Sequence, residues 1–201
     1  MAEGRRPARI SSAPNLLGVA RILATPVVCA LVLVATPGAG LAAFVVFALA
    51  GLTDWADGWL ARRRDEVSPL GVFMDLTADK VLVAGVLVAM VEVGLVPTWM
   101  AATIVIRELV ISGIRQVAAA ASVVIPARAL GKSKTATTLA GMAILLLAWD
   151  AMTGGPLAST GMAAGLETAG FWVMVAATIL TVVSGWDYLR GALPILRGGR
   201  P

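Results

Sequence analysis

The chain has 201 residues, of which 59% are hydrophobic and only 14% are charged. This composition excludes an ordinary soluble globule with a polar coat and indicates an integral membrane protein with a single membrane domain. The formal net charge is +4, but the basic residues flank apolar segments and do not alternate with aromatic ones. We therefore expect a membrane surface and phosphate-bearing substrates as partners, and no nucleic acid.

Six apolar segments have about the 20 residues that a helix needs to cross a bilayer. In chain order they cover residues 15–36, 41–61, 72–93, 99–120, 135–151 and 169–189. The sequence thus predicts an all-α integral membrane fold of six transmembrane helices, with a polar cavity that faces the cytoplasm. Residues 1–12 form a basic juxtamembrane segment, residues 13–190 the membrane domain, and residues 191–201 a basic tail.

The basic residues predict how these helices are oriented, because Lys and Arg concentrate on the cytoplasmic side of a membrane protein. The connections 37–40, 94–97 and 152–168 contain no Lys or Arg. The alternate connections and the termini carry Arg5, Arg6, Arg9, Arg62, Arg63, Arg64, Arg128, Lys132, Lys134, Arg197 and Arg200. We therefore expect a multi-pass protein of the cell membrane with both termini in the cytoplasm.

The most informative stretch is 53–80, where four aspartates lie beside or within apolar runs. We interpret it as two helices joined by the polar turn 63–69. One face of the first helix carries Asp54, Asp57, Gly58, Ala61 and Arg62, and one face of the second carries Gly71, Asp75 and Asp79. The short turn lets the two faces meet, so four carboxylates would converge on one cytoplasmic site.

Clustered carboxylates repel one another, and each costs roughly 2.5 to 3.5 kcal/mol near the middle of a membrane helix. A cation must therefore occupy the site, and ligands that are all oxygen favour a hard ion such as Mg²⁺ over zinc or copper. Two such ions would bind a diphosphate and stabilise both the entering and the leaving oxygen. Because the chain has no histidine, any general base is Asp, Glu, Lys or Tyr.

The spacing of this stretch matches a known signature. The pattern Asp54-x2-Asp57-Gly58-x2-Ala61-Arg62-x8-Gly71-x3-Asp75-x3-Asp79 agrees with that of the CDP-alcohol phosphotransferases at every fixed position. The chain resembles this family over about residues 14–189. Its flanking residues are most similar to the bacterial phosphatidylglycerophosphate synthase branch; they are Pro14-Asn15-Leu16-Leu17 with Arg21, Asp75-x2-Ala78-Asp79-Lys80, Arg107-Glu108 with Arg115, and Gly131-Lys132-x-Lys134-Thr135. Gly18 and Leu76 depart from the pattern, where close relatives usually have Thr and Pro.

The resemblance implies an enzyme of phospholipid biosynthesis that transfers a phosphatidyl group from CDP-diacylglycerol to sn-glycerol 3-phosphate and releases CMP. It implies that two divalent ions, Mg²⁺ or Mn²⁺, are held by Asp54, Asp57, Asp75 and Asp79, and that Asp79 also accepts the proton of the attacking hydroxyl. The residues that it implies for binding of the CDP-lipid are Asn15, Arg21, Gly58, Ala61, Arg62 and Gly71. Arg21 could instead pair with an aspartate, and the residues alone leave this open. The family is usually homodimeric.

Charged residues outside the signature are further candidates, because ionisable groups within a membrane are functional by default. Substrate binding and a structural ion pair are equally open for Arg107 and Glu108. Arg115 lies nearer the cytoplasmic end, which favours substrate binding. The resemblance implies that the acceptor phosphate is bound by Arg107, Arg115, Lys132 and Lys134, with the two lysines just before the fifth predicted helix.

Two alternative functions remain open at this point. Family members share the signature but use different acceptors, so a cardiolipin synthase with phosphatidylglycerol as acceptor is the nearest rival. A cation transporter would also contain buried aspartates, but it leaves Gly58, Arg62 and Gly71 unexplained.

Overall fold

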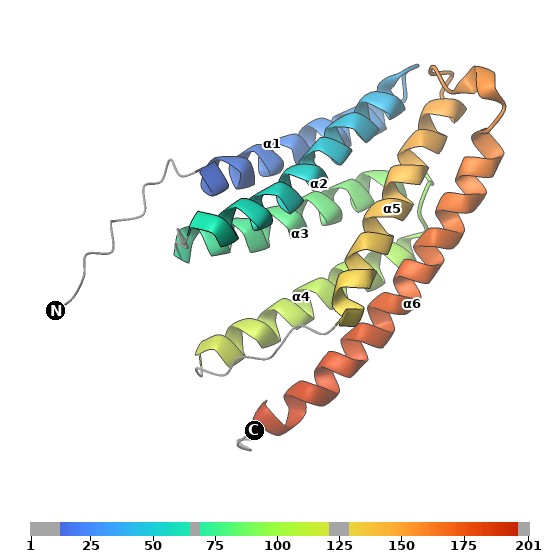
Figure 1. Cartoon of the computed structure of the whole chain (residues 1–201). Helices are drawn as coiled ribbons and strands as arrows, with labels where there is room; N and C mark the ends of the chain where they lie inside the picture. Colours follow the sequence, from blue (N-terminus) through green and yellow to red (C-terminus); the bar gives the residue numbers. More distant parts are fainter. Residues whose placement is uncertain (1–12, 65–68, 121–128, 197–201) are drawn as a thin grey trace.

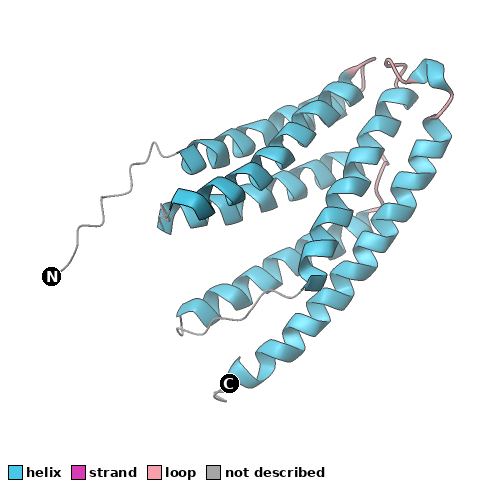
Figure 2. Cartoon of the chain, viewed as in Figure 1, coloured by secondary structure: helices cyan, strands magenta, loops and turns pink. Residues whose placement is uncertain are grey.

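The computed structural model describes residues 13–64, 69–120 and 129–196, and the side chains within these ranges except at 13–16, 54–64, 69–76, 120, 129–130, 132 and 194–196. The described residues form long helices joined by short turns and contain no strand (Figures 1 and 2). The helices are α1 (Ala13–Val34), α2 (Ala39–Arg64), α3 (Pro69–Glu92), α4 (Thr98–Ala120), α5 (Ala129–Met152) and α6 (Ala163–Leu196), with the 3₁₀ turn η1 (Ala158–Thr160) before α6. The prediction of an all-α fold is therefore confirmed.

Three helical segments are long and apolar enough to cross a membrane by length and composition: Leu17–Val34, Ser133–Met152 and Ala163–Leu193. The other three long helices have 26, 24 and 23 residues, and the side chains of α2 and α3 are described only in part. The described side chains of α2 form a shorter apolar segment, Ala39–Thr53. These findings support a membrane protein, while six spans remain a prediction.

The fifth helix begins earlier than the sequence suggested. We expected it to start at residue 135, after a basic connection, but α5 starts at Ala129, so the GKSKT segment 131–135 belongs to its first turns. Lysine is a good helix former, and its long side chain can carry the charge beyond the apolar region. Basic residues were thus a poor marker of the helix start. The last helix, α6, also extends beyond the predicted 169–189 at both ends, and at its C-terminal end it continues past Arg190.

Consecutive helices run in opposite directions, so that the helix ends alternate between the two ends of the bundle (Figure 1). The helix ends that flank the basic segments therefore lie together: the start of α1, the end of α2, the start of α5 and the end of α6. This is the arrangement that the distribution of Lys and Arg predicted. The turns that contain no Lys or Arg lie at the opposite end, which we call the outer end.

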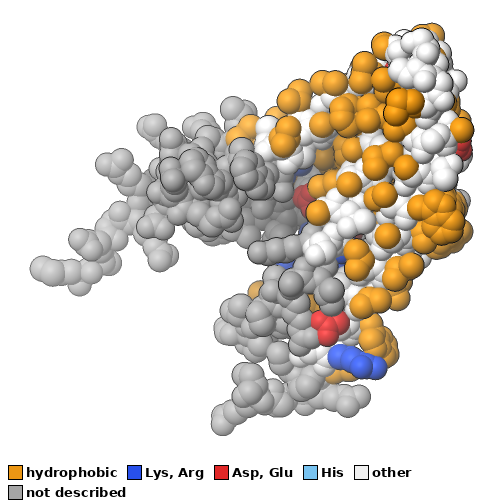
Figure 3. Space-filling view, turned by 45° about the vertical axis from the view of Figure 1, so that its right-hand side comes forward, with side chains coloured by type: hydrophobic (Ala, Val, Ile, Leu, Met, Phe, Trp, Pro, Cys, Tyr) orange, Lys and Arg blue, Asp and Glu red, His pale blue; other side chains and the backbone are white. Residues whose placement is uncertain are grey.

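Packing places apolar side chains both inside and outside the bundle. The core joins all six long helices through fully buried residues that include Val28, Ala43, Leu87, Met100, Leu145 and Met174. On the outside, α6 leaves Trp172, Ile179 and Trp186 largely exposed. Figure 3 shows hydrophobic side chains over much of the face formed by α5 and α6. An apolar exterior around an apolar core is expected of helices that face lipid.

A buried carboxylate holds the outer end together. Asp150, on the last turn of α5, is fully buried. Its Oδ1 accepts a hydrogen bond from Leu41 N at 3.1 Å and its Oδ2 accepts one from Leu157 N at 3.0 Å. The neighbouring Trp149 Nε1 donates to Val32 O at 3.0 Å. These contacts tie the end of α1 and the start of α2 to α5, and they use backbone donors that would otherwise lack a partner.

Replacement of Gly40 by Ala tests this close approach. An added Cβ at Gly40 would lie 2.3 Å from Asp150 N, which is backbone and cannot rotate away. We expect Gly40→Ala to lower stability by about 1–3 kcal/mol and the thermal unfolding temperature in detergent by several degrees. The matched control is Gly51→Ala in the same helix, where an added Cβ meets nothing within 4 Å. An equal effect of both substitutions would contradict the proposed contact.

Candidate active site

The helices that carry the signature end and begin at the same end of the bundle. Asp54 and Asp57 belong to the second half of α2, and Asp75 and Asp79 to the first half of α3. The end of α2 and the start of α3 lie at the same, basic end of the bundle (Figure 1). Both segments that flank the connection 65–68 are helical. This agrees with the helical spacing from which we inferred that the aspartates of each segment share one face.

Most side chains of the predicted CDP-lipid and metal site lie outside the described part of the structure, which gives only their places in the helices. These residues are Asn15, Asp54, Asp57, Gly58, Ala61, Arg62, Gly71 and Asp75, together with Lys132 of the acceptor site. Their predicted roles stay predictions. Among the described side chains, no three His, Cys, Asp or Glu residues gather in one place. Asp79 is described and partly exposed.

Arg21 lies beside the signature from the neighbouring helix. Its side chain is only 2% exposed, and its Nε donates to Ala50 O at 3.3 Å. Ala50 is one helical turn before Asp54 on α2. An arginine buried this far in α1 therefore lies next to the helix that carries the first two aspartates, in agreement with either role that the sequence allowed.

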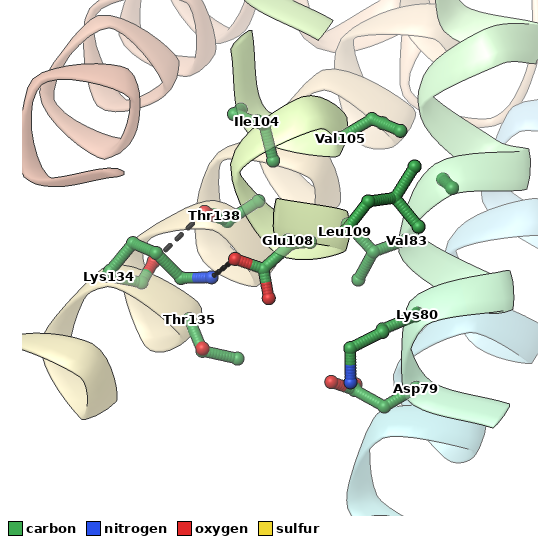
Figure 4. Close-up of a pocket in the computed structure, with 11 residues that line it drawn as sticks. Asp79, Lys80, Val83, Ile104, Val105, Glu108, Leu109, Lys134, Thr135 and Thr138 are labelled. Carbon is green, nitrogen blue, oxygen red and sulfur yellow. Dashed lines mark hydrogen bonds and ion pairs between the residues drawn. The ribbon is translucent and has the colours of Figure 1, made fainter. Parts of the chain in front are cut away.

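A pocket opens between α3, α4 and α5, with Asp79 in its wall (Figure 4). Its polar lining consists of Asp79, Lys80, Glu108, Lys134, Thr135 and Thr138. Its apolar lining consists of Val83, Ala84, Ile104, Val105 and Leu109. Asp79 and Lys134 lie on different helices and attract one another electrostatically. The pocket thus joins the last aspartate of the signature to a lysine from the GKSKT segment.

One carboxylate organises the charges around this pocket. Glu108 Oε1 accepts hydrogen bonds from Lys134 Nζ at 2.5 Å and from Arg107 Nη1 at 2.7 Å. Arg107 Nη2 in turn donates to Ser184 Oγ on α6 at 3.1 Å. Lys134 is only 4% exposed, so its ammonium group is held away from water by this pair. The three charged groups carry a net charge of +1, which suits a pocket for an anion.

The structure separates the three described basic side chains that were expected to bind the acceptor phosphate, Lys134, Arg107 and Arg115; Lys132 lies outside the described side chains. Lys134 lines the pocket. Arg107 and Arg115 are described but do not line it: Arg107 contacts Glu108 and Ser184, and the Arg115 guanidinium carbon lies 5.6 Å from the centre of the Tyr188 ring. The adjacent position of Arg107 and Glu108 had left a structural ion pair open, and such a pair is present.

Sequence reasoning missed several residues of this site. Lys80 and Thr138 line the pocket, and Ser184 supports Arg107. Lys80 could have been found, because it directly follows the last aspartate of the signature. Ser184 gave no usable signal, since a single serine in an apolar helix is common and usually bonds to its own backbone.

A family model for CDP-alcohol phosphatidyltransferases matches residues 11–183, which include the signature and the pocket. The chain belongs to this family. CDP-alcohol phosphatidyltransferases are enzymes that generally use divalent metal ions, and carboxylate oxygens such as those of Asp79 and of the other signature aspartates fit a hard divalent ion.

Relatives with assigned names resemble the chain over most of its length. A protein of Bacillus subtilis (strain 168) named CDP-diacylglycerol–glycerol-3-phosphate 3-phosphatidyltransferase is 35% identical over 87% of this chain and 92% of its own. A Mycobacterium tuberculosis (strain ATCC 25618 / H37Rv) protein named probable phosphatidylglycerophosphate synthase is 33% identical over 96% of this chain and 87% of its own. A cardiolipin synthase (CMP-forming) of Oryza sativa subsp. japonica is 32% identical over 72% of this chain but only 48% of its own.

The ion pair between Arg107 and Glu108 predicts a structural effect of Arg107. Arg107→Ala leaves the partly buried Glu108 with one cation fewer and removes the contact to Ser184. We expect a loss of roughly 1–3 kcal/mol and a lower unfolding temperature in detergent. Arg190→Ala is the control, because Arg190 is exposed and stacks on Trp186 at 5.0 Å, a contact of less than about 1 kcal/mol. Similar unfolding temperatures for both variants would argue against a structural role of Arg107.

Proposed function

We propose that this protein transfers a phosphatidyl group from CDP-diacylglycerol to the 1-hydroxyl of sn-glycerol 3-phosphate and releases CMP. The observation that carries the proposal is the pocket in which Asp79 of the family signature faces Lys134 across the space between α3 and α5. It offers a proton acceptor and a buried cation to one small anionic alcohol. The names of the relatives from B. subtilis and M. tuberculosis support the same acceptor.

The proposed metal site consists of Asp54, Asp57, Asp75 and Asp79. Two Mg²⁺ or Mn²⁺ ions bound there would neutralise the diphosphate and stabilise the oxygen that leaves with CMP. Arg62 would add a further cation, and Gly58 and Ala61 would leave room for the cytidine group. Asn15, Arg21 and Gly71 complete the proposed CDP-lipid site.

In the proposed reaction, the acceptor oxygen attacks the phosphorus that carries diacylglycerol, and the bond from this phosphorus to the oxygen of CMP breaks. Asp79 accepts the proton of the attacking hydroxyl, and CMP leaves as an anion. Lys134 aligns the acceptor by attracting its phosphate, since both substrates are anionic and would otherwise repel each other. Lys132 and Arg115 are proposed as further phosphate contacts. For Arg107, the contacts to Glu108 and Ser184 favour a supporting role.

We also propose the placement that this chemistry requires. The reaction site faces the cytoplasm, where soluble glycerol phosphate is available, and both termini lie on that side of a cell membrane that six helices cross. The acyl chains stay in the lipid between the helices, and only the head group enters the cavity. We propose a homodimer, because members of this family usually form homodimers.

The acceptor decides between this function and its nearest rival. A cardiolipin synthase uses phosphatidylglycerol and needs no pocket for a small phosphate monoester, whereas the buried Lys134 favours one. The transporter alternative loses its basis, because the chain belongs to a family of transferases.

The first test measures CMP released by the purified protein from CDP-diacylglycerol with Mg²⁺ or Mn²⁺. The acceptors compared are sn-glycerol 3-phosphate, phosphatidylglycerol, inositol phosphate and serine. We expect release to depend on both the metal and glycerol 3-phosphate. Release that depends on another acceptor would overturn the proposed substrate, and the absence of release with any of them would overturn the proposed function.

Asp79→Asn separates proton transfer from binding. An amide cannot accept the proton, so we expect transfer to fall by at least roughly 100-fold, while metal-dependent binding of the CDP-lipid largely persists. The measurements are CMP release and retention of labelled CDP-diacylglycerol by the immobilised protein. Asp75→Asn is the matched comparison, because a metal ligand that takes no proton should lose binding and transfer together. Equal loss of both activities in Asp79→Asn would make Asp79 an essential ligand instead.

A further inference from the structure

The two carboxylate oxygens of Glu108 have different surroundings. Among the described side chains, two cations contact this residue, Lys134 and Arg107, and both donate to Oε1. In Figure 4 the other oxygen of Glu108 points into the space between Thr135 on one side and Lys80 and Asp79 on the other. The Glu108 side chain is 22% exposed and lines the pocket, so a ligand can reach this oxygen.

The neighbours of Glu108 hold this oxygen in place. Arg107 is fixed on its other side by Ser184, and its Cγ lies 3.1 Å from where a Cβ at Gly185 would be. Lys134 is buried and cannot turn away into water. Two cations on one oxygen keep the carboxylate ionised and set its direction, which leaves the lone pairs of Oε2 available to a donor.

The charge balance limits what that donor can be. Glu108 is already compensated by two cations, so a further cation would be repelled by the net positive charge of the group. An anionic group would be repelled by Oε2 itself. A neutral hydroxyl remains, because it can donate to the carboxylate without changing the charge. A buried cation and a free carboxylate oxygen side by side therefore suit a ligand that has both a phosphate and a hydroxyl group.

We propose that Glu108 is a specificity-determining residue whose Oε2 accepts a hydrogen bond from the hydroxyl of the acceptor that does not react. This inference rests on the proposed function, in which the 1-hydroxyl of glycerol 3-phosphate attacks and the 2-hydroxyl stays free. Glu108 thereby distinguishes a polyol phosphate from a simple hydroxyalkyl phosphate. Lys134 and Arg107 act as positioning residues for the carboxylate.

The test compares two acceptors that differ only in this hydroxyl: sn-glycerol 3-phosphate and 3-hydroxypropyl phosphate, which lacks the 2-hydroxyl. The measured quantity is the ratio of their kcat/KM values in CMP release. A hydrogen bond to a charged group corresponds to a ratio of roughly 10 to 100 in the wild-type protein. A wild-type ratio near one overturns the proposal, even if no Glu108 variant folds.

Variants then assign the discrimination to Glu108. Glu108→Ala should bring the ratio close to one, and Glu108→Gln, which keeps a neutral acceptor oxygen of similar shape, should give an intermediate ratio. Ser112→Ala is the matched control, because the Ser112 hydroxyl donates to the backbone oxygen of Glu108 at 2.6 Å and does not contact the carboxylate, and it should keep the wild-type ratio. A purely structural role of Glu108 would lower both kcat/KM values by the same factor, so an unchanged ratio in Glu108→Ala overturns the proposal.

The design separates this inference from the proposed function. If glycerol 3-phosphate supports no CMP release while another acceptor does, the proposed function fails, and the inference fails with it. If glycerol 3-phosphate is used but 3-hydroxypropyl phosphate is used equally well, only the inference fails.

Discussion

The site depends on one ion-pair group, in which Glu108 is shared between Arg107 and Lys134. Charges within apolar helices are unfavourable unless they are paired, and Lys134 is only 4% exposed. The single carboxylate pairs with both cations and leaves a net charge of +1 beside the pocket. It also joins three helices, because its partners lie on α4 and α5 and Arg107 reaches Ser184 on α6. The pairing that stabilises the charges therefore also sets the geometry of the pocket.

The two ends of the bundle differ in how their carboxylates are used. At the outer end Asp150 is fully buried and satisfies backbone donors of α2 and of the connection before α6. Close contacts at Gly40 and Gly155 leave no room for larger residues around this carboxylate. At the basic end, the pocket keeps polar groups accessible between α3, α4 and α5. A carboxylate whose oxygens are both occupied serves packing, whereas Glu108, with one occupied oxygen, can still bind a ligand.

The sequence predicted those features that depend on local spacing or on charge along the chain. The helical character and the family both follow from residues close together in the sequence, such as Asp54 and Asp57. It could not predict the partner of Glu108, because Lys134 lies 26 residues away on another helix and no spacing rule connects them. It misjudged the start of α5 at Lys132 and Lys134, since a basic residue can end an apolar segment without ending a helix. The same limit applies to Arg107 and Glu108. Adjacent residues point in different directions around a helix, yet these two side chains form an ion pair.

The signature residues and most of the other residues that line the pocket lie on different helices, which suggests how one reaction can serve several acceptors. The aspartate signature lies on α2 and α3, whereas Glu108, Lys134 and Thr138 come from α4 and α5 and lie outside the signature. In the proposed function, the first set binds the diphosphate that all CDP-alcohol substrates share and supplies Asp79 as the proton acceptor, and the second set contacts the rest of the acceptor. A change of acceptor then requires new residues on α4 and α5 but none in the signature. A relative named cardiolipin synthase can thus match 72% of this chain although its name indicates a different product. We expect Glu108 to be the residue that distinguishes one acceptor alcohol from another.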